Sequence, residues 1–431
     1  MKKTVLLALY AFSNVAMAQT NSTKSFEDIW SSLYQKSYQQ KSAVQDKLAN
    51  ELTLERANRH WLPRAYVAGQ WFSTNDPTQV FFSNLGQRSI QQADFIPSDL
   101  NRPGRKNFTT GTLGIDLPLY EGGMKSAQAS MFDSLVKASE LEVKAKKTEE
   151  YSELSRQYGG ALVHAQNGAL LAELKNNLQK IISGYQVGSQ SNPVGYSGLL
   201  GLKGVDNRIE GMSYEFEMKM SNAQKWINTK TESTENWSPD LNLRLKDFLN
   251  TNLTQTSSIS YSTMMLAQEL KVKTLDDAKE MEKARFLPKV GLFAQNNLYS
   301  GARSSATSQA YGVYLMWDLF NSDSYGRVGE ASAKSMAAEA KLNAAKQEEK
   351  IMLSQLLESK TTLEKNLVLL EKTDGLLKEQ TVNAMKLFRS GMLSALQLAE
   401  VINRRVDLIE NKNKAETQYL EVYSRLYQLN N

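Results

Sequence analysis

Two stretches of the chain, Trp61-Leu62-Pro63-Arg64 and Phe286-Leu287-Pro288-Lys289, share one pattern, and 225 positions separate residue 61 from residue 286. A polar, helical stretch without proline precedes each copy, at 26–60 and 259–286. Such self-similarity indicates two structural repeats of one architecture. We place the first repeat at 19–230, a linker rich in Asn, Thr and Ser at 231–258, and the second repeat at 259–431.

Each repeat contains two amphipathic segments that alternate with a period of two. In 113–119 the residues Leu113, Ile115, Leu117 and Leu119 occupy every second position, and 313–319 repeats this arrangement. A period of two puts alternate side chains on opposite faces of a strand. The pattern therefore predicts strands near 63–75, 108–120, 288–299 and 308–320, with one apolar face. The other face carries residues such as Thr112, Gly114 and Asp116.

A long helical region without proline follows each strand pair, at 124–187 and 324–389. Each would be roughly 95–100 Å long if continuous. The second carries a seven-residue leucine repeat typical of a coiled coil, at Leu356, Leu363, Leu370 and Leu377. Gly159-Gly160 predicts a kink or a split in the first. Glycine-bearing turns and return helices at 199–230 and 392–428 complete two antiparallel hairpins.

Composition excludes several classes of function. The chain has 431 residues, no cysteine and two histidines, which rules out disulfides and Cys-based metal sites. Its formal charge of +5 is too small for its length to indicate a nucleic-acid partner. The sequence contains no nucleophile elbow, phosphate-binding loop or HExxH motif. We therefore predict no enzymatic activity, no cofactor and no metal site.

The N-terminus has the pattern of a secretory signal peptide at 1–18. Lys2 and Lys3 precede a short apolar run, and Ala16-Met17-Ala18 forms a small-x-small cleavage site. No later stretch has the roughly 18 apolar residues of a transmembrane helix. An exported chain that spans a membrane without such a helix must use strands.

Four strands per chain cannot close a barrel, because the smallest single-chain membrane barrels have about eight. Three chains would supply about twelve strands and leave a lumen. The charged helical hairpins would then project into an aqueous compartment as a tube. The alternative is an exported coiled-coil scaffold or adaptor protein, which would explain the helices but not two amphipathic strand pairs in matching places.

Several motifs resemble those of the TolC family of outer-membrane efflux proteins, over nearly the whole mature chain. Pro118-Leu119-Tyr120-Glu121-Gly122-Gly123 is similar to the strand exit of the family, in which Pro118, Gly122 and Gly123 are the defining residues. The segment 317–322 is a degraded second copy without the glycine pair. The first inter-strand loop contains Asn75-Asp76-Pro77 and Ala93-Asp94-Phe95, which resemble a subset of the family.

The resemblance implies a mixed fold, in which long α-helical hairpins form a periplasmic α-barrel and each chain adds four strands to a trimeric β-barrel of about twelve strands. It implies an outer-membrane homotrimer that acts as a passive exit duct in tripartite efflux or type I secretion. The implied partners are outer-membrane lipid, a periplasmic adaptor and an inner-membrane pump.

The turns near Gly188 and Gly391 resemble the hairpin-tip motif of the family, aromatic-x-x-Gly-x-x-Ser. The resemblance implies contacts with the adaptor at Val187, Gly188, Ser189, Ser390, Gly391, Met392 and Ser394. Turn geometry alone would also explain the glycines. The first turn carries an insertion at 189–194.

The family closes its periplasmic end with acidic side chains just past the second turn. Counted from Gly391, these two positions fall on Gln397 and Glu400, and only Glu400 keeps the charge. Three such carboxylates around an axis would repel one another and attract cations. The alternative is that Glu400 is a solvated residue on the surface of the return helix.

Overall fold

The computed structural model describes residues 22–185, 193–254 and 261–431. It divides into two compact units, and each unit contains segments from both sequence repeats. The first unit comprises the described residues up to Ser42, together with Lys144–Ser262 and Glu348–Asn431. The second comprises Ala43–Val143 and Thr263–Gln347. The predicted signal peptide at 1–18 lies outside the described residues, and the repeat boundaries remain a prediction.

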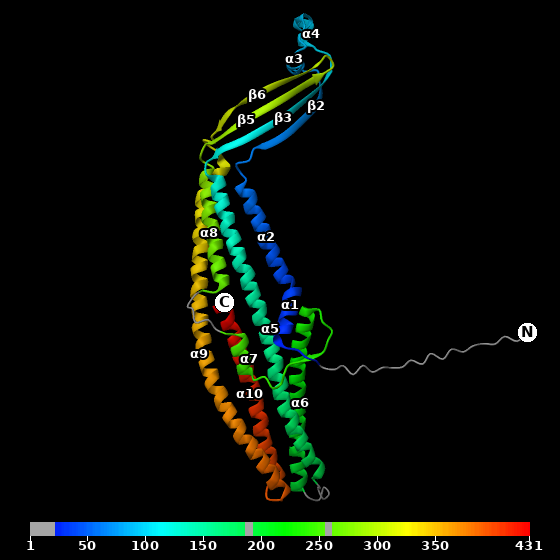
Figure 1. Ribbon diagram of the computed structural model, residues 1–431, viewed down its shortest axis with the longest axis vertical. Coiled ribbons are helices and arrows are strands. Elements are labelled where there is room, and N and C mark those ends of the chain that lie inside the picture. The colour runs from blue at the N-terminus through cyan, green and yellow to red at the C-terminus, as the bar shows by residue number, and fades with distance from the viewer. Residues whose placement is uncertain (1–21, 186–192, 255–260) are drawn as a thin grey trace, which may run out of the picture. The chain divides into compact units, whose positions relative to one another are not determined.

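The second unit is built on a four-stranded antiparallel sheet (Figure 1). Its strands are β2 (Arg64–Thr74), β3 (Lys106–Glu121), β5 (Lys289–Gly301) and β6 (Ser305–Met316), in the order β2-β3-β5-β6. The two repeats therefore meet at the β3–β5 pair, and β2 and β6 are the edge strands. All four predicted strands are confirmed, with one correction: β6 ends at Met316 rather than near 320. The indole N–H of Trp317 donates instead to the carbonyl of Phe286, at 3.0 Å.

The register separates the side chains of the sheet into an apolar and a polar face, because directly paired residues point to the same side. One row of the apolar face contains Ala65, Ile115, Ala294 and Tyr311. The polar face includes the row Ala68, Thr112, Asn297 and Ser308. On it the Thr112 hydroxyl donates to Asn297 at 2.8 Å. The predicted amphipathic alternation is therefore confirmed.

The strand-exit motif has a geometric explanation. The register of β3 shifts between Pro118 and Tyr120, which indicates a β-bulge beside the proline. Gly122 and Gly123 have φ angles of +67° and +82°, which side chains with a β-carbon rarely adopt. They turn the chain from the strand into helix α5 (Met124–Gly184). At the second exit a single glycine, Gly326 with φ +80°, precedes α9 (Arg327–Arg389).

The segment between β2 and β3 folds into three short helices that the sequence motifs did not reveal. They are α3 (Pro77–Gly86), the 3₁₀ helix η1 (Gln92–Phe95) and α4 (Pro97–Asn101). The Asp76 side chain caps α3 by accepting from the backbone N–H of Gln79 at 2.8 Å, and Pro77 occupies the first turn of the helix. Figure 1 shows these helices at the end of the sheet opposite α8 (Thr263–Ala284).

The predicted helical hairpins are confirmed. In the first half α5 is followed by α6 (Pro193–Thr231), and in the second α9 is followed by α10 (Ala395–Asn430). The other elements within the described residues are α1 (Phe26–Lys36), α2 (Tyr38–Asn58), α7 (Leu245–Asn252), the short strands β1 (Ser22–Thr23) and β4 (Trp237–Ser238), and η2 (Ser322–Ser324). No helix in the described ranges is both long and apolar enough to cross a membrane.

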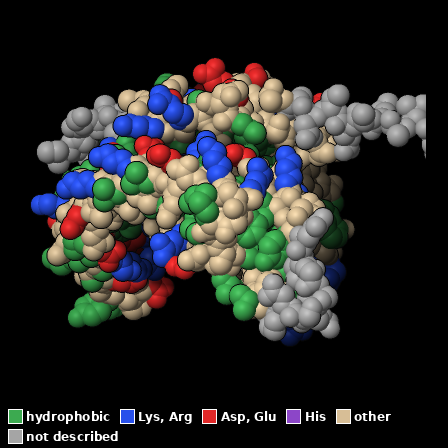
Figure 2. Space-filling view, turned by 90° about the horizontal axis from the view of Figure 1, so that it is seen from below, with side chains coloured by type: hydrophobic (Ala, Val, Ile, Leu, Met, Phe, Trp, Pro, Cys, Tyr) green, Lys and Arg blue, Asp and Glu red, His purple; other side chains and the backbone are tan. Residues whose placement is uncertain are grey.

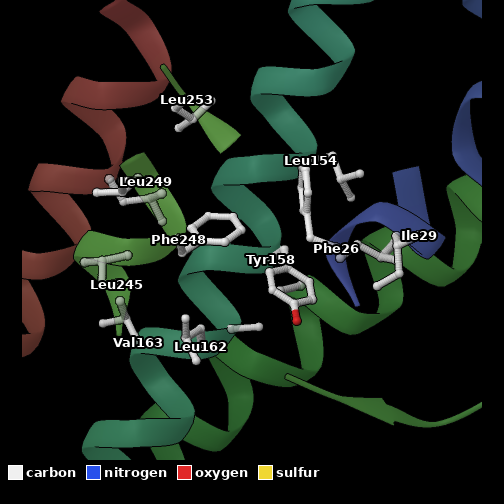
Figure 3. Close-up of a cluster of buried hydrophobic side chains, with 14 of the residues drawn as sticks. Phe26, Ile29, Leu154, Tyr158, Leu162, Val163, Leu245, Phe248, Leu249 and Leu253 are labelled. Atoms are coloured by element: carbon white, nitrogen blue, oxygen red, sulfur yellow. The ribbon is translucent and has the colours of Figure 1, made fainter. Parts of the chain in front are cut away.

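The inter-repeat linker forms part of a hydrophobic core in the first unit (Figure 3). Trp237 and Phe248 are each 1% exposed, and the Trp237 ring stacks on the Tyr158 ring with centroids 5.5 Å apart. Gly159 lies on α5 where a β-carbon would come within 2.8 Å of Leu420 and 3.1 Å of Phe248. The predicted kink or split at Gly159-Gly160 is not a split, since α5 is continuous. Gly159 gives room for neighbouring side chains.

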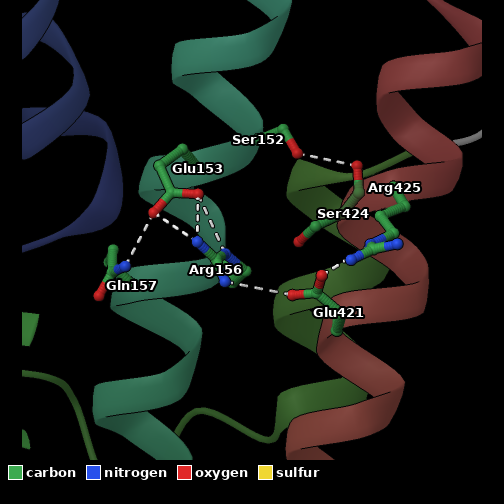
Figure 4. Close-up of polar contacts among 7 residues, drawn as sticks. All are labelled: Ser152, Glu153, Arg156, Gln157, Glu421, Ser424 and Arg425. Carbon is green, nitrogen blue, oxygen red and sulfur yellow. Dashed lines mark hydrogen bonds and ion pairs between the residues drawn. The ribbon is translucent and has the colours of Figure 1, made fainter.

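Polar contacts also join α5 and α10 in this unit. The Ser152 hydroxyl donates to the Ser424 carbonyl at 2.8 Å, and Arg156 lies between Glu153 and Glu421 at 2.6 and 3.4 Å (Figure 4). Such links fix the pairing of the two helices, although exposed ion pairs contribute little free energy.

His164, on α5, is directed toward α10 rather than toward solvent. The side chain is buried, and its Nδ1 lies 3.0 Å from the Asn413 amide oxygen. Burial lowers the pKa of His164, which favours the neutral ring. The residue therefore has a structural role in joining α5 and α10.

Candidate functional site at the helical turns

The turn from α9 to α10 is short and fixed by its own backbone. Gly391 has φ +77°, and its N–H donates to the Phe388 carbonyl at 3.1 Å. The N–H of Met392 donates to the Leu387 carbonyl at 2.9 Å. This pair of bonds is the Schellman motif, which ends a helix at a residue in the left-handed conformation. The glycine is therefore required by the turn itself, and Met392 is left 72% exposed.

A capping box begins α10 immediately after this turn. The Ser394 hydroxyl accepts from the backbone N–H of Gln397 at 3.3 Å. In return, the side-chain oxygen Oε1 of Gln397 accepts from the backbone N–H of Ser394 at 3.0 Å. The side chain of Gln397 is thus committed to capping the helix. The structure explains Ser394 and Gln397 by local geometry, while their predicted contacts with an adaptor or a gate remain predictions.

The first turn is described on its two flanks only. Tyr185 directly follows α5, and its hydroxyl donates to the Gly195 carbonyl across the turn at 3.4 Å. The predicted contact residues Val187, Gly188 and Ser189 lie outside the described residues. The Tyr185 ring packs against Phe388 of the other hairpin, with ring centroids 5.4 Å apart. Tyr185 and Phe388 are the aromatic positions of the tip motif, and they join the two turns.

A hollow of about 610 Å³ lies between the described parts of the two turns. Its wall combines apolar and basic side chains, contributed by Lys180, Ile181, Tyr185, Val194, Phe388, Arg389, Leu393 and Leu396. Val194 is 76% exposed and Leu396 is 51% exposed. In the view from below (Figure 2), blue basic and red acidic side chains are interspersed with green hydrophobic ones at this end of the molecule. Such a surface can bind a partner that offers apolar and acidic groups.

The hollow rests on a well-packed core formed by all four hairpin helices. The buried residues there include Leu171 and Leu178 of α5, Leu202 of α6, and Leu398 and Ile402 of α10. A β-carbon on Gly198 would come within 2.6 Å of the Ala395 β-carbon, so α6 and α10 are in close contact. A rigid base of this kind holds the exposed residues of the turns in place.

Glu400 lies on α10, one turn beyond the capping box. Its carboxylate forms an ion pair with Arg404, four residues later on the same helix, and its side chain is 63% exposed. Within one chain, Glu400 is therefore a solvated residue on the surface of the return helix, which is the alternative to a gate. Whether Glu400 faces a pore depends on neighbouring copies, so the gate remains a prediction.

The described residues hold no group of three or more His, Asp or Glu side chains arranged to bind a metal ion. Exposed apolar and basic side chains on fixed turns form a surface that another macromolecule can contact. The basic residues Lys180 and Arg389 were not predicted, because only their positions in the folded hairpins bring them together.

Comparison with known proteins identifies the architecture. No family model and no curated protein matches the sequence. Among solved structures, the CmeC outer membrane channel of Campylobacter jejuni matches with 15% identity and a TM-score of 0.73, over 99% of this chain and 94% of that one. The open state of the MtrE outer membrane channel of Neisseria gonorrhoeae matches with 12% identity and a TM-score of 0.70, over 98% and 97%. The chain has the fold of these channels.

A third solved structure agrees with this conclusion. It is the transmembrane channel CusC, which matches with 10% identity and a TM-score of 0.77, over 96% of each chain. The matches extend over nearly the full length of both partners, so both the strands and the hairpin helices belong to the shared fold. The fold predicted from the sequence motifs is confirmed at the level of the single chain.

Proposed function

We propose that the protein belongs to the TolC family and forms an exit duct in the bacterial outer membrane, with its helical tunnel in the periplasm. Three copies close a barrel of about twelve strands, and the hairpins of the three copies form the tunnel. The duct is passive and serves tripartite efflux or type I secretion. An inner-membrane pump supplies the energy through a periplasmic adaptor.

The observation that carries this proposal is the two-faced sheet with edge strands β2 and β6. One face presents Val67, Leu113, Tyr311 and Val313 at exposures of 57–86%, which is unfavourable in water and favourable in lipid. The other face is polar, as the wall of an aqueous lumen requires. Edge strands must pair with another chain before the sheet can lie in a bilayer. A ring of identical copies satisfies both conditions.

A second apolar surface supports oligomerisation. On α9 the residues Ile351, Leu357, Leu369, Leu376 and Val382 are exposed by 44–69%. The predicted leucine repeat at Leu356, Leu363, Leu370 and Leu377 lies on a different, half-buried side of the helix. The helix therefore has two apolar sides, and a neighbouring copy would cover the exposed one.

The turns are proposed as the docking surface for the adaptor. The rigid Gly391 turn, the exposed Met392 and the basic hollow beside them support this assignment. The proposed contacts are Val187, Gly188, Ser189, Ser390, Gly391, Met392 and Ser394. Glu400 is proposed as the acidic member of a gate just inside the turns.

The first test is the mass and projected shape of the mature chain, purified in detergent and imaged by electron microscopy. A detergent-dependent trimer with a compact barrel and a long stalk would support the duct. A monomer or dimer that is soluble in buffer without detergent would contradict it. That outcome would favour the exported coiled-coil scaffold or adaptor protein.

A further inference from the structure

The helical segment between β2 and β3, residues 75–105, lies on the polar side of the sheet, and we call it the cap. A β-carbon on Gly86, at the end of α3, would come within 2.9 Å of the Tyr299 ring. Tyr299 pairs with Thr110, and Thr110 pairs with Gln70, so the Tyr299 ring belongs to the polar face. The cap therefore contacts the polar face at the end of the sheet away from α8, where Figure 1 shows α3 and α4.

One arginine fastens the cap to the turn between β5 and β6. The Arg303 guanidinium donates to both carboxylate oxygens of Asp94, at 2.6 and 2.7 Å. The same guanidinium donates to the Ser89 carbonyl at 3.2 Å. The Asp94 side chain is only 11% exposed, and its carboxylate also accepts from the Gln91 N–H at 2.8 Å. A two-pronged pair of this kind fixes orientation as well as distance.

Two further contacts join the cap to β5–β6. The Ser304 hydroxyl donates to the Gln87 carbonyl at 2.6 Å, and Arg88 donates to the Thr307 carbonyl at 3.0 Å. Arg88 has φ +55°, a left-handed conformation that is uncommon for a residue with a β-carbon. The cap is thus bound to strands more than 200 positions away in the sequence, instead of extending freely from the hairpin that carries it.

We propose that the cap is a lid that narrows the outer mouth of the duct, and that the Arg303–Asp94 pair is the clasp that holds it closed. This inference rests on the proposed function, because the polar face encloses a lumen only when several copies form a barrel. A closed lid prevents large solutes outside the cell from entering the lumen and lets small solutes pass. The hydrogen bonds from Arg303 hold the pKa of the Asp94 carboxyl at about 2, so the clasp is charged on both sides at neutral pH.

The test uses the absence of cysteine from the chain. Ser308→Cys places a single thiol on the polar face. The thiol lies two strand positions beyond the row of Tyr299, which the cap contacts. Intact cells that express this parent variant are treated with a small maleimide, or with a maleimide on a long polyethylene glycol chain. The lid predicts fast labelling by the small reagent and slow labelling by the large one. Adding Arg303→Ala should speed labelling by the large reagent roughly tenfold, since hydrogen bonds between charged groups contribute enough to shift an opening equilibrium by that factor.

Arg105→Ala is the matched control, because it removes an exposed arginine from the same segment and should leave both rates unchanged. If Arg303→Ala fails to assemble, Asp94→Asn tests the same pair. The exchange Asp94→Arg with Arg303→Asp should restore exclusion of the large reagent. Equal labelling by both reagents in the parent, or unchanged exclusion after loss of the clasp, would overturn the lid. No labelling by the small reagent would instead count against the proposed duct.

Discussion

The phenol ring of Tyr314 lies over Gly291 on the neighbouring strand, so that a β-carbon added to Gly291 would come within 2.5 Å of the ring. The two residues are direct partners in the β5–β6 register. A large ring over a glycine covers the strand where the glycine has no side chain, and it fixes the register of the pair. Phe293 and Gly312 repeat the arrangement with a shortest approach of 3.0 Å.

Gly291→Ala should therefore destabilise the assembled barrel. The new methyl group forces the Tyr314 ring out of its position, and overpacking of this kind costs about 1–3 kcal/mol. The measurement is the temperature at which the detergent-solubilised oligomer dissociates. Gly69→Ala is the control, because the nearest atom to its β-carbon would be the Thr110 carbonyl oxygen at 4.0 Å. Equal dissociation temperatures for both variants would contradict the packing explanation.

Gly391→Ala should impair export while leaving the oligomer intact. Its φ of +77° costs roughly 1 kcal/mol for alanine, and the strain falls on a turn that the proposed adaptor would contact. Export is measured as the resistance to toxic compounds of cells that depend on this channel for their removal. Gly375→Ala, within helix α9, serves as the control and should stabilise the protein by about 1 kcal/mol. Full export by Gly391→Ala would argue against a contact at this turn.

Glu400→Gln should increase ion leak through the channel and reduce its preference for cations. Removing the carboxylate removes the repulsion and the cation attraction expected of an acidic ring. Planar-bilayer recordings measure both quantities. Glu330→Gln removes an exposed glutamate with a similar ion pair, to Lys334, and should change neither. If Glu400→Gln also changes neither, the residue is a surface glutamate paired with Arg404 and not a gate.

Glu416→Gln should stabilise the protein at neutral pH. Burial raises the pKa of Glu416, even though Lys412 lies 3.8 Å away and Asn167 donates to the carboxylate at 2.8 Å. Because the folded state favours the protonated acid, the contribution of Glu416 to stability is greatest below its unfolded pKa of about 4.3 and is lost as pH rises through the folded pKa.

The advantage of Glu416→Gln should therefore grow as pH increases above about 4 and vanish below it. Thermal unfolding of both proteins across this pH range measures the difference. Glu330→Gln provides the comparison, since the hydrogen bond from Lys334 lowers the pKa of Glu330. A constant difference between Glu416→Gln and the parent at all pH values would refute the titration.

Much of the fold could be read from periodicity. The four strands and the hairpin helices were predicted close to their observed bounds, because a period of two and the absence of proline are local properties. The linker was harder, since its Asn, Thr and Ser residues concealed Trp237 and Phe248 as core residues. The Gly159-Gly160 pair was misleading for a related reason. A glycine that makes room for Leu420 cannot be distinguished in the sequence from one that breaks a helix.

The candidate site was only partly predictable. Gly391 and Ser394 were identified through a motif, and the structure adds why the turn needs them. The hollow and its basic residues depend on contacts between hairpins that are about 200 positions apart. The cap was invisible for the same reason, because Arg303 and Asp94 come together only after β3 and β5 pair.

The edge strands of the sheet have a genetic consequence. If β2 of each copy pairs with β6 of the next, every subunit supplies two different halves of the contact, and one faulty edge leaves the ring open. In a cell that makes equal amounts of normal chain and of a chain with a ruined β6 edge, about one ring in eight would contain normal subunits only. Such alleles should be dominant, and export should fall far below half of the level in cells that make only the normal chain.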